Sequence, residues 1–254
     1  MNICIIQARM GSSRLPGKVL RNVFDKPILQ HVIDRLSLSR TIDKIVVATT
    51  TNTEDDSIQQ HCDDRGIACY RGSDWDVLTR FSEAAITHGA KSGDAIIRIC
   101  CDNPIHSWKV VDFVVDQFYR YKTDYFSNSN QEPYYLEDGF DVEVVTFDAL
   151  QKAKENAKLL SEREHVMPYV KNSKQFKLGW RKANEHYRFK LSVDTENDLL
   201  LAESIFKELQ NIPDFSIDDV VSLLQSKPQL LAINSDSEIN SGYKKSLRDD
   251  RMIK

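Results

Sequence analysis

A short loop after the first apolar run concentrates side chains that can bind an anion. Residues 8–18 contain three cations, two hydroxyl groups and two glycines. Glycine lets the backbone approach an anion closely, Arg binds phosphate oxygens through paired N–H groups, and Lys adds a compact charge. The composition therefore predicts a phosphate-binding loop. Its candidate residues are Ala8, Arg9, Gly11, Ser12, Ser13, Arg14 and Lys18.

This loop differs from two common nucleotide-binding motifs. Five residues separate Gly11 from Gly17, where a P-loop has four, and Val19 stands where that motif has Ser or Thr. The GxGxxG spacing of dinucleotide-binding folds is also missing. A basic surface loop without a ligand is the alternative that the residues leave open.

Two aspartates that follow predicted strands could hold a metal ion. Asp102 follows a strand predicted at 95–100, and Asp194 follows one predicted at 189–193. Magnesium needs only one or two protein carboxylates when a substrate supplies phosphate oxygens. The pair therefore predicts a magnesium–nucleotide site, although Asp194 could instead cap the helix that follows it.

Further polar residues have both a functional and a structural interpretation. Arg71 and Ser73 precede a predicted helix and could form a turn and a cap, while Arg80 could form a surface ion pair. Asp141 and Glu143 alternate along a predicted strand and therefore share a face. Two carboxylates on one face favour a cation or a ligand between them, but exposed acids on strands are also common.

A charged segment begins with a sequence typical of a helical capping box. The run 161–164 is Ser-Glu-Arg-Glu, and Pro168 should stop or kink the helix that follows. Glu162, Arg163 and His165 could contact a substrate or simply form a charged first turn.

Alternating strand and helix patterns must position these residues. Apolar β-branched runs predict strands at 3–7, 44–49, 67–70 and 95–100, and helical spacing predicts helices at 28–38, 54–65 and 77–88. This alternation predicts an α/β fold with a mostly parallel sheet and helices on both faces. Such sheets bind ligands at the carboxyl ends of their strands, where the loops after Gln7 and Cys100 lie.

The second half of the chain has a different rhythm. Helices are predicted at 108–121, from 148 onward and at 195–210, and strands at 124–127, 140–147, 176–180 and 189–193. We predict one domain over residues 1–233, with 124–180 as a smaller inserted β/α flap. Residues 234–254 are polar and basic, which is typical of a solvated terminus.

Composition excludes several classes of partner. The net charge of the 254 residues is −4, so no global basic field attracts nucleic acid or an anionic membrane. No apolar run approaches the roughly 18 residues of a membrane helix. The five cysteines are odd in number and lack CxxC spacing, which favours free thiols over disulfides or a zinc site. We therefore expect a cytoplasmic protein.

The quoted motifs also resemble a known family. Residues 6–20 resemble the opening motif of the cytidylyltransferases, which include the CMP-Kdo and CMP-acylneuraminate synthetases, and the SpsF branch of spore-coat polysaccharide biosynthesis proteins is the nearest. The other similar segments are 71–73, 76–78, 80–81, 98–104, 139–144, 162–169, 191–195 and 239–247. Cys101 departs from the pattern, because the family usually has glycine directly before the first metal-binding aspartate.

The resemblance implies a Rossmann-like nucleotidyltransferase that moves CMP from CTP to an acidic keto-sugar or related sugar for surface polysaccharide, releasing pyrophosphate. It implies Mg²⁺ as cofactor and a homodimer formed partly by the flap. The implied catalytic residues are Arg9, Lys18, Asp102 and Asp194, and the last two would hold the metal. Arg71, Ser73, Arg80 and Arg98 would join the loop in binding the nucleotide. Asp141, Glu143, Glu162, Arg163 and His165 would lie on the sugar side.

Two other functions stay open at this stage. A glycosyltransferase would also place metal-binding aspartates at strand ends, but the sequence lacks an Asp-x-Asp motif near its middle. A non-catalytic nucleotide-binding protein of a polysaccharide pathway is the second alternative, and Cys101 is its only support.

Overall fold

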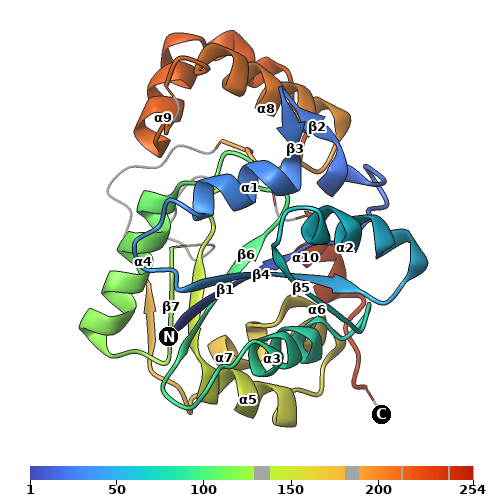
Figure 1. Ribbon diagram of the computed structural model, residues 1–254, viewed down its shortest axis with the longest axis vertical. Helices are drawn as coiled ribbons and strands as arrows, with labels where there is room; N and C mark the ends of the chain where they lie inside the picture. Colours follow the sequence, from blue (N-terminus) through green and yellow to red (C-terminus); the bar gives the residue numbers. More distant parts are fainter. Residues whose placement is uncertain (129–137, 181–188, 213, 240, 254) are drawn as a thin grey trace.

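The computed structural model describes residues 1–128, 138–180, 189–212, 214–239 and 241–253 (Figure 1). Within these ranges seven strands form one sheet in the order β5-β4-β1-β6-β8-β7-β9. The strand β8 runs antiparallel to both of its neighbours, and the other paired strands are parallel. The bounds are β1 Asn2–Gln7, β4 Lys44–Thr50, β5 Ala68–Gly72, β6 Ala95–Cys100, β7 Tyr125–Ser127, β8 Glu143–Thr146 and β9 Leu178–Trp180. A separate hairpin pairs β2 Asn22–Val23 with β3 Lys26–Pro27.

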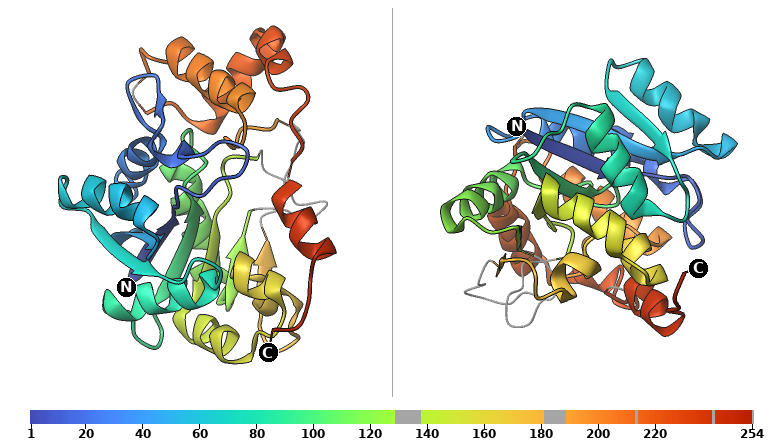
Figure 2. Two further views of the ribbon diagram at one scale, coloured as in Figure 1. Left: turned by 90° about the vertical axis from the view of Figure 1, so that its right-hand side faces the viewer. Right: turned by 90° about the horizontal axis from the view of Figure 1, so that it is seen from below.

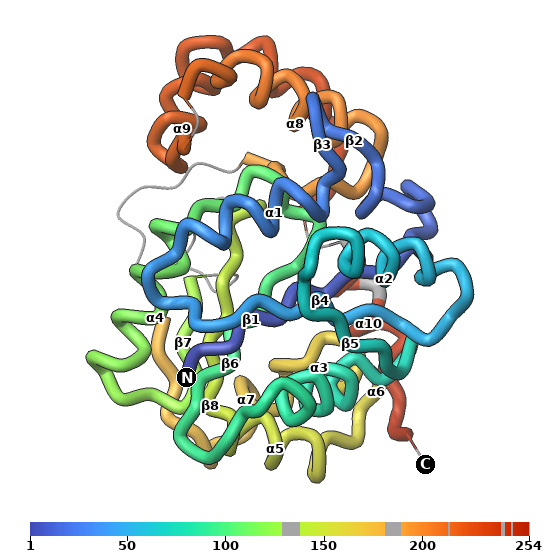
Figure 3. Tube along the Cα trace, in the orientation of Figure 1, coloured from blue at the N-terminus to red at the C-terminus, as the bar shows by residue number. Residues whose placement is uncertain are grey.

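Alternation along the strands builds a core on each face of the sheet. In β1, Ile3 and Ile5 point to one face and Cys4 and Ile6 to the other, and all four are fully buried. The face of Cys4 is covered by α1 Ile28–Leu36, α2 Asp56–Asp63 and α4 Trp108–Tyr121. The opposite face is covered by α3 Val77–Thr87, α5 Phe147–Asn156 and α7 Pro168–Asn172 (Figure 3). The predicted fold, a mostly parallel sheet with helices on both faces, is confirmed.

The remaining elements lie around this sandwich. They are η1 Lys18–Leu20, η2 Thr53–Asp55, α6 Leu160–His165, α8 Glu196–Glu208, α9 Ile217–Ser226, η3 Pro228–Ala232 and α10 Ser241–Arg248. Helices α8 and α9 pack together beyond α1, next to the hairpin β2–β3 (Figure 1). None of the described helices is both long and apolar enough to span a membrane.

The segment 124–180, which we predicted as an inserted flap, is continuous with the main sheet. It supplies β7, β8 and β9, and β8 pairs directly with β6. Its helices α5 and α7 share the core that α3 covers. The segment therefore extends the sheet on the side of β6, and part of it lies outside the described residues.

Two predicted strands are wrong in whole or in part, because side chains form hydrogen bonds with their backbone N–H and carbonyl groups. The predicted strand 189–193 forms only an isolated bridge at Lys190, and the Asp138 carboxylate accepts the N–H groups of Leu191 and Ser192 at 3.2 and 2.9 Å. The predicted strand 140–147 is confirmed only over Glu143–Thr146. Before it, the Asn128 side chain bonds the Phe140 carbonyl and the Val142 N–H instead of a neighbouring strand.

The predicted capping box and the solvated tail also need correction. The helix α6 begins at Leu160, and Glu162 accepts the N–H groups of Lys158 and Leu159 at 2.7 and 2.9 Å. Ser161 is not the cap, because its hydroxyl and N–H donate to Asp250 in the C-terminal segment. Pro168 opens the next helix, α7. The described part of the tail is therefore docked onto α6.

A buried carboxylate fixes the loop that leads into β4, and its loss should destabilise the protein. Asp112 is 3% exposed and accepts hydrogen bonds from the Ser39 and Thr41 hydroxyls and the Arg40 N–H at 2.6, 2.8 and 3.1 Å. We expect Asp112→Ala to lower the free energy of unfolding in urea at pH 7 by about 2–4 kcal/mol, since several donors lose an ionised acceptor. The exposed residue Asp116 of the same helix provides the control, Asp116→Ala.

This loss should shrink in acid. Burial alone would raise the pKa of Asp112, but hydrogen bonds from Ser39, Thr41 and Arg40 outweigh it and hold the pKa below its ordinary value. A depressed pKa in the folded state adds stability above the ordinary pKa of an aspartate, and this stability is lost as pH falls through the folded value. Equal stabilities of the Asp112 and Asp116 variants at pH 7 would contradict this role.

Candidate active site

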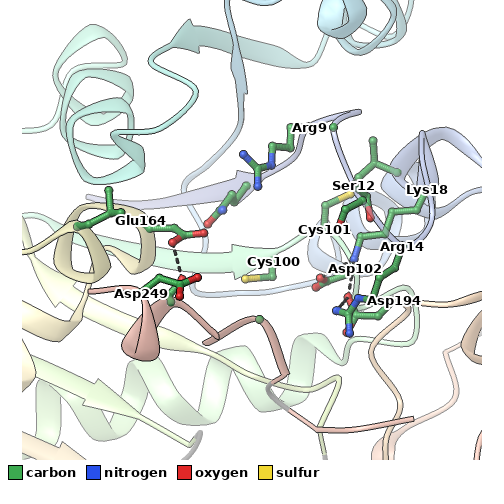
Figure 4. Close-up of a pocket in the computed structure, with 17 residues that line it drawn as sticks. Arg9, Ser12, Arg14, Lys18, Cys100, Cys101, Asp102, Glu164, Asp194 and Asp249 are labelled. Atoms are coloured by element: carbon green, nitrogen blue, oxygen red, sulfur yellow. Dashed lines mark hydrogen bonds and ion pairs between the residues drawn. The ribbon is translucent and has the colours of Figure 1, made fainter. Parts of the chain in front are cut away.

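A cavity of about 470 Å³ opens at the carboxyl ends of β1 and β6. Gln7 and Cys100, the last residues of these strands, line it, and Figure 4 shows Cys100 between its two ends. The other lining residues are Arg9, Gly11, Ser12, Ser13, Arg14, Lys18, Val19, Cys101, Asp102, Leu160, Glu164, Asp194, Gly242, Ser246 and Asp249. The cavity thus lies where the fold class predicts a ligand.

The cationic loop after β1 is held from below by buried contacts. Asp55 is fully buried and its carboxylate accepts the Met10 N–H at 2.7 Å and the Thr50 N–H at 3.1 Å. At the other end of the loop, the Gly17 N–H returns to the Met10 carbonyl at 2.9 Å. Gly17 has φ 68°, which is a left-handed conformation that glycine adopts without strain. These contacts close the loop and start η1 at Lys18.

The Lys18 ammonium joins the two predicted metal ligands. Its Nζ donates to Asp102 at 3.0 Å, to Asp194 at 2.9 Å and to the Val193 carbonyl at 2.7 Å. The Lys18 side chain is 11% exposed. Burial alone would lower the pKa of Lys18, but Asp102 and Asp194 outweigh it and raise the pKa above its usual range. The ammonium is therefore charged, and all three of its donors are used.

Asp194 is surrounded by cations and is not the cap of α8. Arg14 and Lys190 approach its carboxylate at 3.1 Å each, in addition to Lys18. Burial would raise the pKa of Asp194, but Lys18 and Lys190 outweigh it and hold the pKa well below its usual range. Thr195 caps α8 instead: its hydroxyl accepts the Asp198 N–H, and its own N–H donates to the Asp198 carboxylate at 2.9 Å. This leaves Asp194 ionised and directed into the cavity.

The carboxylates of Asp102 and Asp194 suit a divalent cation that also binds phosphate. Asp102 and Asp194 converge on one point, which the Lys18 ammonium occupies. Among the described residues, no group of three or more His, Cys, Asp or Glu side chains is arranged to hold a metal by itself. Two carboxylates are sufficient for magnesium when a nucleotide supplies further oxygens. The pair therefore suits a magnesium–nucleotide complex better than a free metal ion.

The structure brings together most of the predicted phosphate loop and all four predicted catalytic residues. Arg9, Lys18, Asp102 and Asp194 line the cavity, as do Gly11, Ser12, Ser13 and Arg14. Ala8 does not, because it is 2% exposed and packs in the core. Cys101 is also 2% exposed and packs in the core, and it contributes to the lining of the cavity.

The other predicted nucleotide residues do not line the cavity. The Arg71 guanidinium binds Asp56 at 2.6 Å, and Ser73 accepts the Asp76 N–H at 3.0 Å. Arg80 is fully buried and donates to the Ser73 carbonyl. Arg98 donates to the Gln7 side chain at 3.1 Å. In this arrangement Arg80 and Arg98 support residues at or near the site instead of lining it.

The residues predicted for the sugar side do not line the cavity either. Glu143 pairs with Arg98 and accepts from Tyr125 at 2.7 Å, and burial opposed by Lys171 and Arg98 leaves its pKa lowered to about 2. Burial and the Asp138 carboxylate raise the pKa of Asp141 to about 8.

The charged segment around α6 is also engaged elsewhere. Glu162 binds the start of its own helix, and Arg163 donates to the Ala157 carbonyl at 2.8 Å. Burial lowers the pKa of His165 to about 4, so its imidazole is neutral at pH 7. The His165 ring packs edge-on against Tyr243 at 4.8 Å between ring centroids.

Sequence reasoning missed the wall opposite the cationic loop. Leu160 and Glu164 come from α6, and Gly242, Ser246 and Asp249 come from the C-terminal segment. Glu164 belongs to the charged motif 162–165, of which only Glu162, Arg163 and His165 were predicted to lie on the sugar side. The tail carries the similar segment 239–247, which was the available signal that it has more than a solvated role.

The chain is similar to several known proteins over most of its length. The sequence model of the family described as cytidylyltransferase matches residues 3–239. An uncharacterised protein of Methanocaldococcus jannaschii is 39% identical over 237 residues, covering 92% of this chain and 94% of that protein. The spore coat polysaccharide biosynthesis protein SpsF of Bacillus subtilis is 30% identical and covers 88% of this chain and 94% of its own length.

A solved structure is also similar over nearly the whole chain. It is a cytidylyltransferase from Leptospira borgpetersenii, with a TM-score of 0.84 and 30% identity. The match covers 94% of this chain and 98% of that one.

Lys190 forms a buried ion pair with Asp194, and we predict that replacing Lys190 strongly destabilises the protein. Its side chain is 6% exposed, and its Nζ lies 3.1, 3.6 and 3.9 Å from the carboxylates of Asp194, Asp198 and Asp138. Lys190→Met leaves these acids without that cation, so we expect the free energy of unfolding to fall by about 3–5 kcal/mol in urea at pH 7.

The matched control is Lys227→Met. Lys227 pairs with Glu208 at 2.6 Å, but its side chain is 41% exposed, so its loss should cost about 0.5 kcal/mol or less. Two variants of equal stability would refute the role assigned to Lys190.

Proposed function

The chain belongs to the cytidylyltransferase family and is a nucleotidyltransferase, and on that premise we propose that it transfers CMP from CTP to an acidic keto-sugar. A sugar hydroxyl oxygen forms the new bond to the α-phosphorus of CTP. The bond between the α-phosphorus and the bridging oxygen breaks, pyrophosphate leaves, and the hydroxyl proton passes to solvent. The observation that carries this proposal is the convergence of Lys18, Asp102 and Asp194 beside a cationic loop.

The loop supplies the charge that the triphosphate needs. Arg9, Arg14 and Lys18 line one side of the cavity and would hold the β- and γ-phosphates and the departing pyrophosphate. Chemistry of this kind depends mainly on positioning and charge neutralisation, so no covalent nucleophile is required. Arg98 holds the Gln7 side chain, which lines the cavity, through a hydrogen bond of 3.1 Å.

Magnesium is the proposed cofactor, with Asp102 and Asp194 as its protein ligands. When bound, it would neutralise phosphate charge and polarise the α-phosphate. Both carboxylates bind the Lys18 ammonium in the free protein, so Lys18 and the cation compete for the same oxygens. An ammonium released from these carboxylates would remain beside the loop, where it can bind a phosphate.

The acceptor, the assembly and the cellular site are also parts of the proposal. SpsF, to which the chain is similar, carries a name from spore coat polysaccharide biosynthesis, which supports an acceptor for surface polysaccharide. We propose that Asp141, Glu143, Glu162, Arg163 and His165 shape the sugar side from behind the cavity wall. A homodimer formed through 124–180 and action in the cytoplasm complete the proposal, and the five free cysteines fit a reducing compartment.

The direct test is release of pyrophosphate by the purified protein with magnesium, each of the four NTPs and a panel of acidic keto-sugars. The panel should include 3-deoxy-manno-octulosonate and acylneuraminates. We expect release with CTP and one sugar class. If another NTP is strongly preferred, CTP specificity is wrong. If no nucleotide raises the melting temperature or supports release, the proposed function is wrong.

The two aspartates should be essential for turnover. We predict that Asp102→Asn and Asp194→Asn each lower kcat for pyrophosphate release about 100-fold or more, the scale of losing one contact to transition-state charge. Asp116→Asn removes an exposed carboxylate on α4 and serves as the matched control, with kcat close to that of the wild type. Circular dichroism checks that each variant is folded. Wild-type turnover by either site variant would remove that aspartate from the mechanism.

A further inference from the structure

The C-terminal segment, residues 241–253, folds back over the proposed active site. Figure 2 shows it in red, with its end beside the helices α5–α7. It is anchored on α6 by backbone bonds from the Leu160 N–H to the Arg251 carbonyl at 2.9 Å and from the Ile253 N–H to the Lys158 carbonyl at 2.8 Å. Bonds from Ser161 to Asp250 fix the same turn. The segment is therefore a built part of the fold.

This segment supplies side chains to the cavity. Gly242, Ser246 and Asp249 line it, and the Ser246 hydroxyl donates to the Glu164 carboxylate of α6. Figure 4 shows Glu164 and Asp249 on the side of the cavity away from Lys18, with Cys100 between. The match to the family model ends at residue 239, so Gly242, Ser246 and Asp249 lie beyond it, whereas Leu160 and Glu164 lie within it.

Charge divides the cavity into two sides. Arg9, Arg14 and Lys18 attract a triphosphate, whereas Glu164 and Asp249 repel one. The side formed by α6 and α10 presents carboxylates and a hydroxyl, which accept hydrogen bonds from donors such as sugar hydroxyl or amino groups. A carboxylate of the acceptor would be disfavoured there, so it must point toward the cationic side.

We propose that the C-terminal segment determines which acceptor the enzyme takes, with Asp249, Ser246 and Glu164 contacting its hydrogen-bond-donating part. This inference rests on the proposed function, because it assigns the second substrate of the same cavity. The loop after β1, Asp102 and Asp194 bind the nucleotide in this account, and the wall formed by α6 and the terminal segment selects the sugar. Asp249 and Glu164 are specificity-determining residues in this account, and the reacting phosphate lies on the other side.

The test separates acceptor binding from nucleotide binding. The measurement uses the sugar that supports pyrophosphate release by the wild type. We expect Asp249→Asn and Glu164→Gln to raise the KM for this sugar about tenfold, since each replaces a charged carboxylate that accepts hydrogen bonds with a neutral amide. The Kd for CTP, measured by calorimetry without acceptor, should stay within about twofold of the wild type because the phosphate side is unchanged. Ser246→Ala should shift the acceptor KM in the same direction.

Matched controls remove exposed acids elsewhere. Asp116→Asn on α4 and Glu155→Gln on α5 remove the same charges outside the cavity and should leave both constants unchanged. A chain ending at 239 can fail to fold because α6 loses its partner, so the point variants and their melting temperatures carry the test.

The outcomes distinguish the two proposals. If the wild type turns over and both Asp249→Asn and Glu164→Gln keep the wild-type acceptor KM, the inference is wrong and the proposed function stands. If the Kd for CTP changes instead, the wall contacts the nucleotide, and the inference is again wrong. If the wild type neither binds CTP nor releases pyrophosphate with any acceptor, the proposed function falls and the inference falls with it.

Discussion

The arrangement of the site depends on one buried cation, the Lys18 ammonium. It ties together a loop after β1, a residue after β6 and a segment 176 residues away in sequence. Asp102 and Asp194 would repel each other in a partly buried site without a cation between them. In the free protein Lys18 supplies that charge, so the two carboxylates are held convergent before a substrate arrives. Such preorganisation is what charge-stabilising catalysis requires.

The surrounding fold positions the Lys18 ammonium and the two carboxylates that bind it. The parallel pairing of β1 with β6 places the loop and Asp102 at one edge of the sheet. The Val193 N–H then binds the Asp102 carbonyl at 2.8 Å, which docks the third segment beside the first two. Lys190 and Asp138 hold the same segment from the opposite side. The result is a network of alternating charges in which each acid has a cationic or N–H partner, as buried charges require.

Most of the α/β sandwich and the cationic half of the site could be predicted, because both leave local signals. Apolar runs predict β1, β4 and β6. The cations, hydroxyl groups and glycines of the loop after Gln7 predict that it binds an anion. The prediction of a strand at 189–193 is wrong because its apolar pattern suits a strand, whereas the N–H groups of Leu191 and Ser192 donate to Asp138 instead of to a neighbouring strand. The wall formed by α6 and α10 was missed because polarity alone suggests a solvated tail. Long-range bonds such as Ser161 to Asp250 show that it is docked, and neither residue type predicts such a bond.

The most direct test of the central claim is the position of a divalent cation in crystals grown with CTP and Mn²⁺, located by anomalous scattering. The account predicts a peak between the carboxylates of Asp102 and Asp194, bound also by phosphate oxygens, with the Lys18 ammonium moved onto the triphosphate. A peak elsewhere, with Lys18 still bound to both carboxylates beside a bound CTP, would contradict the account.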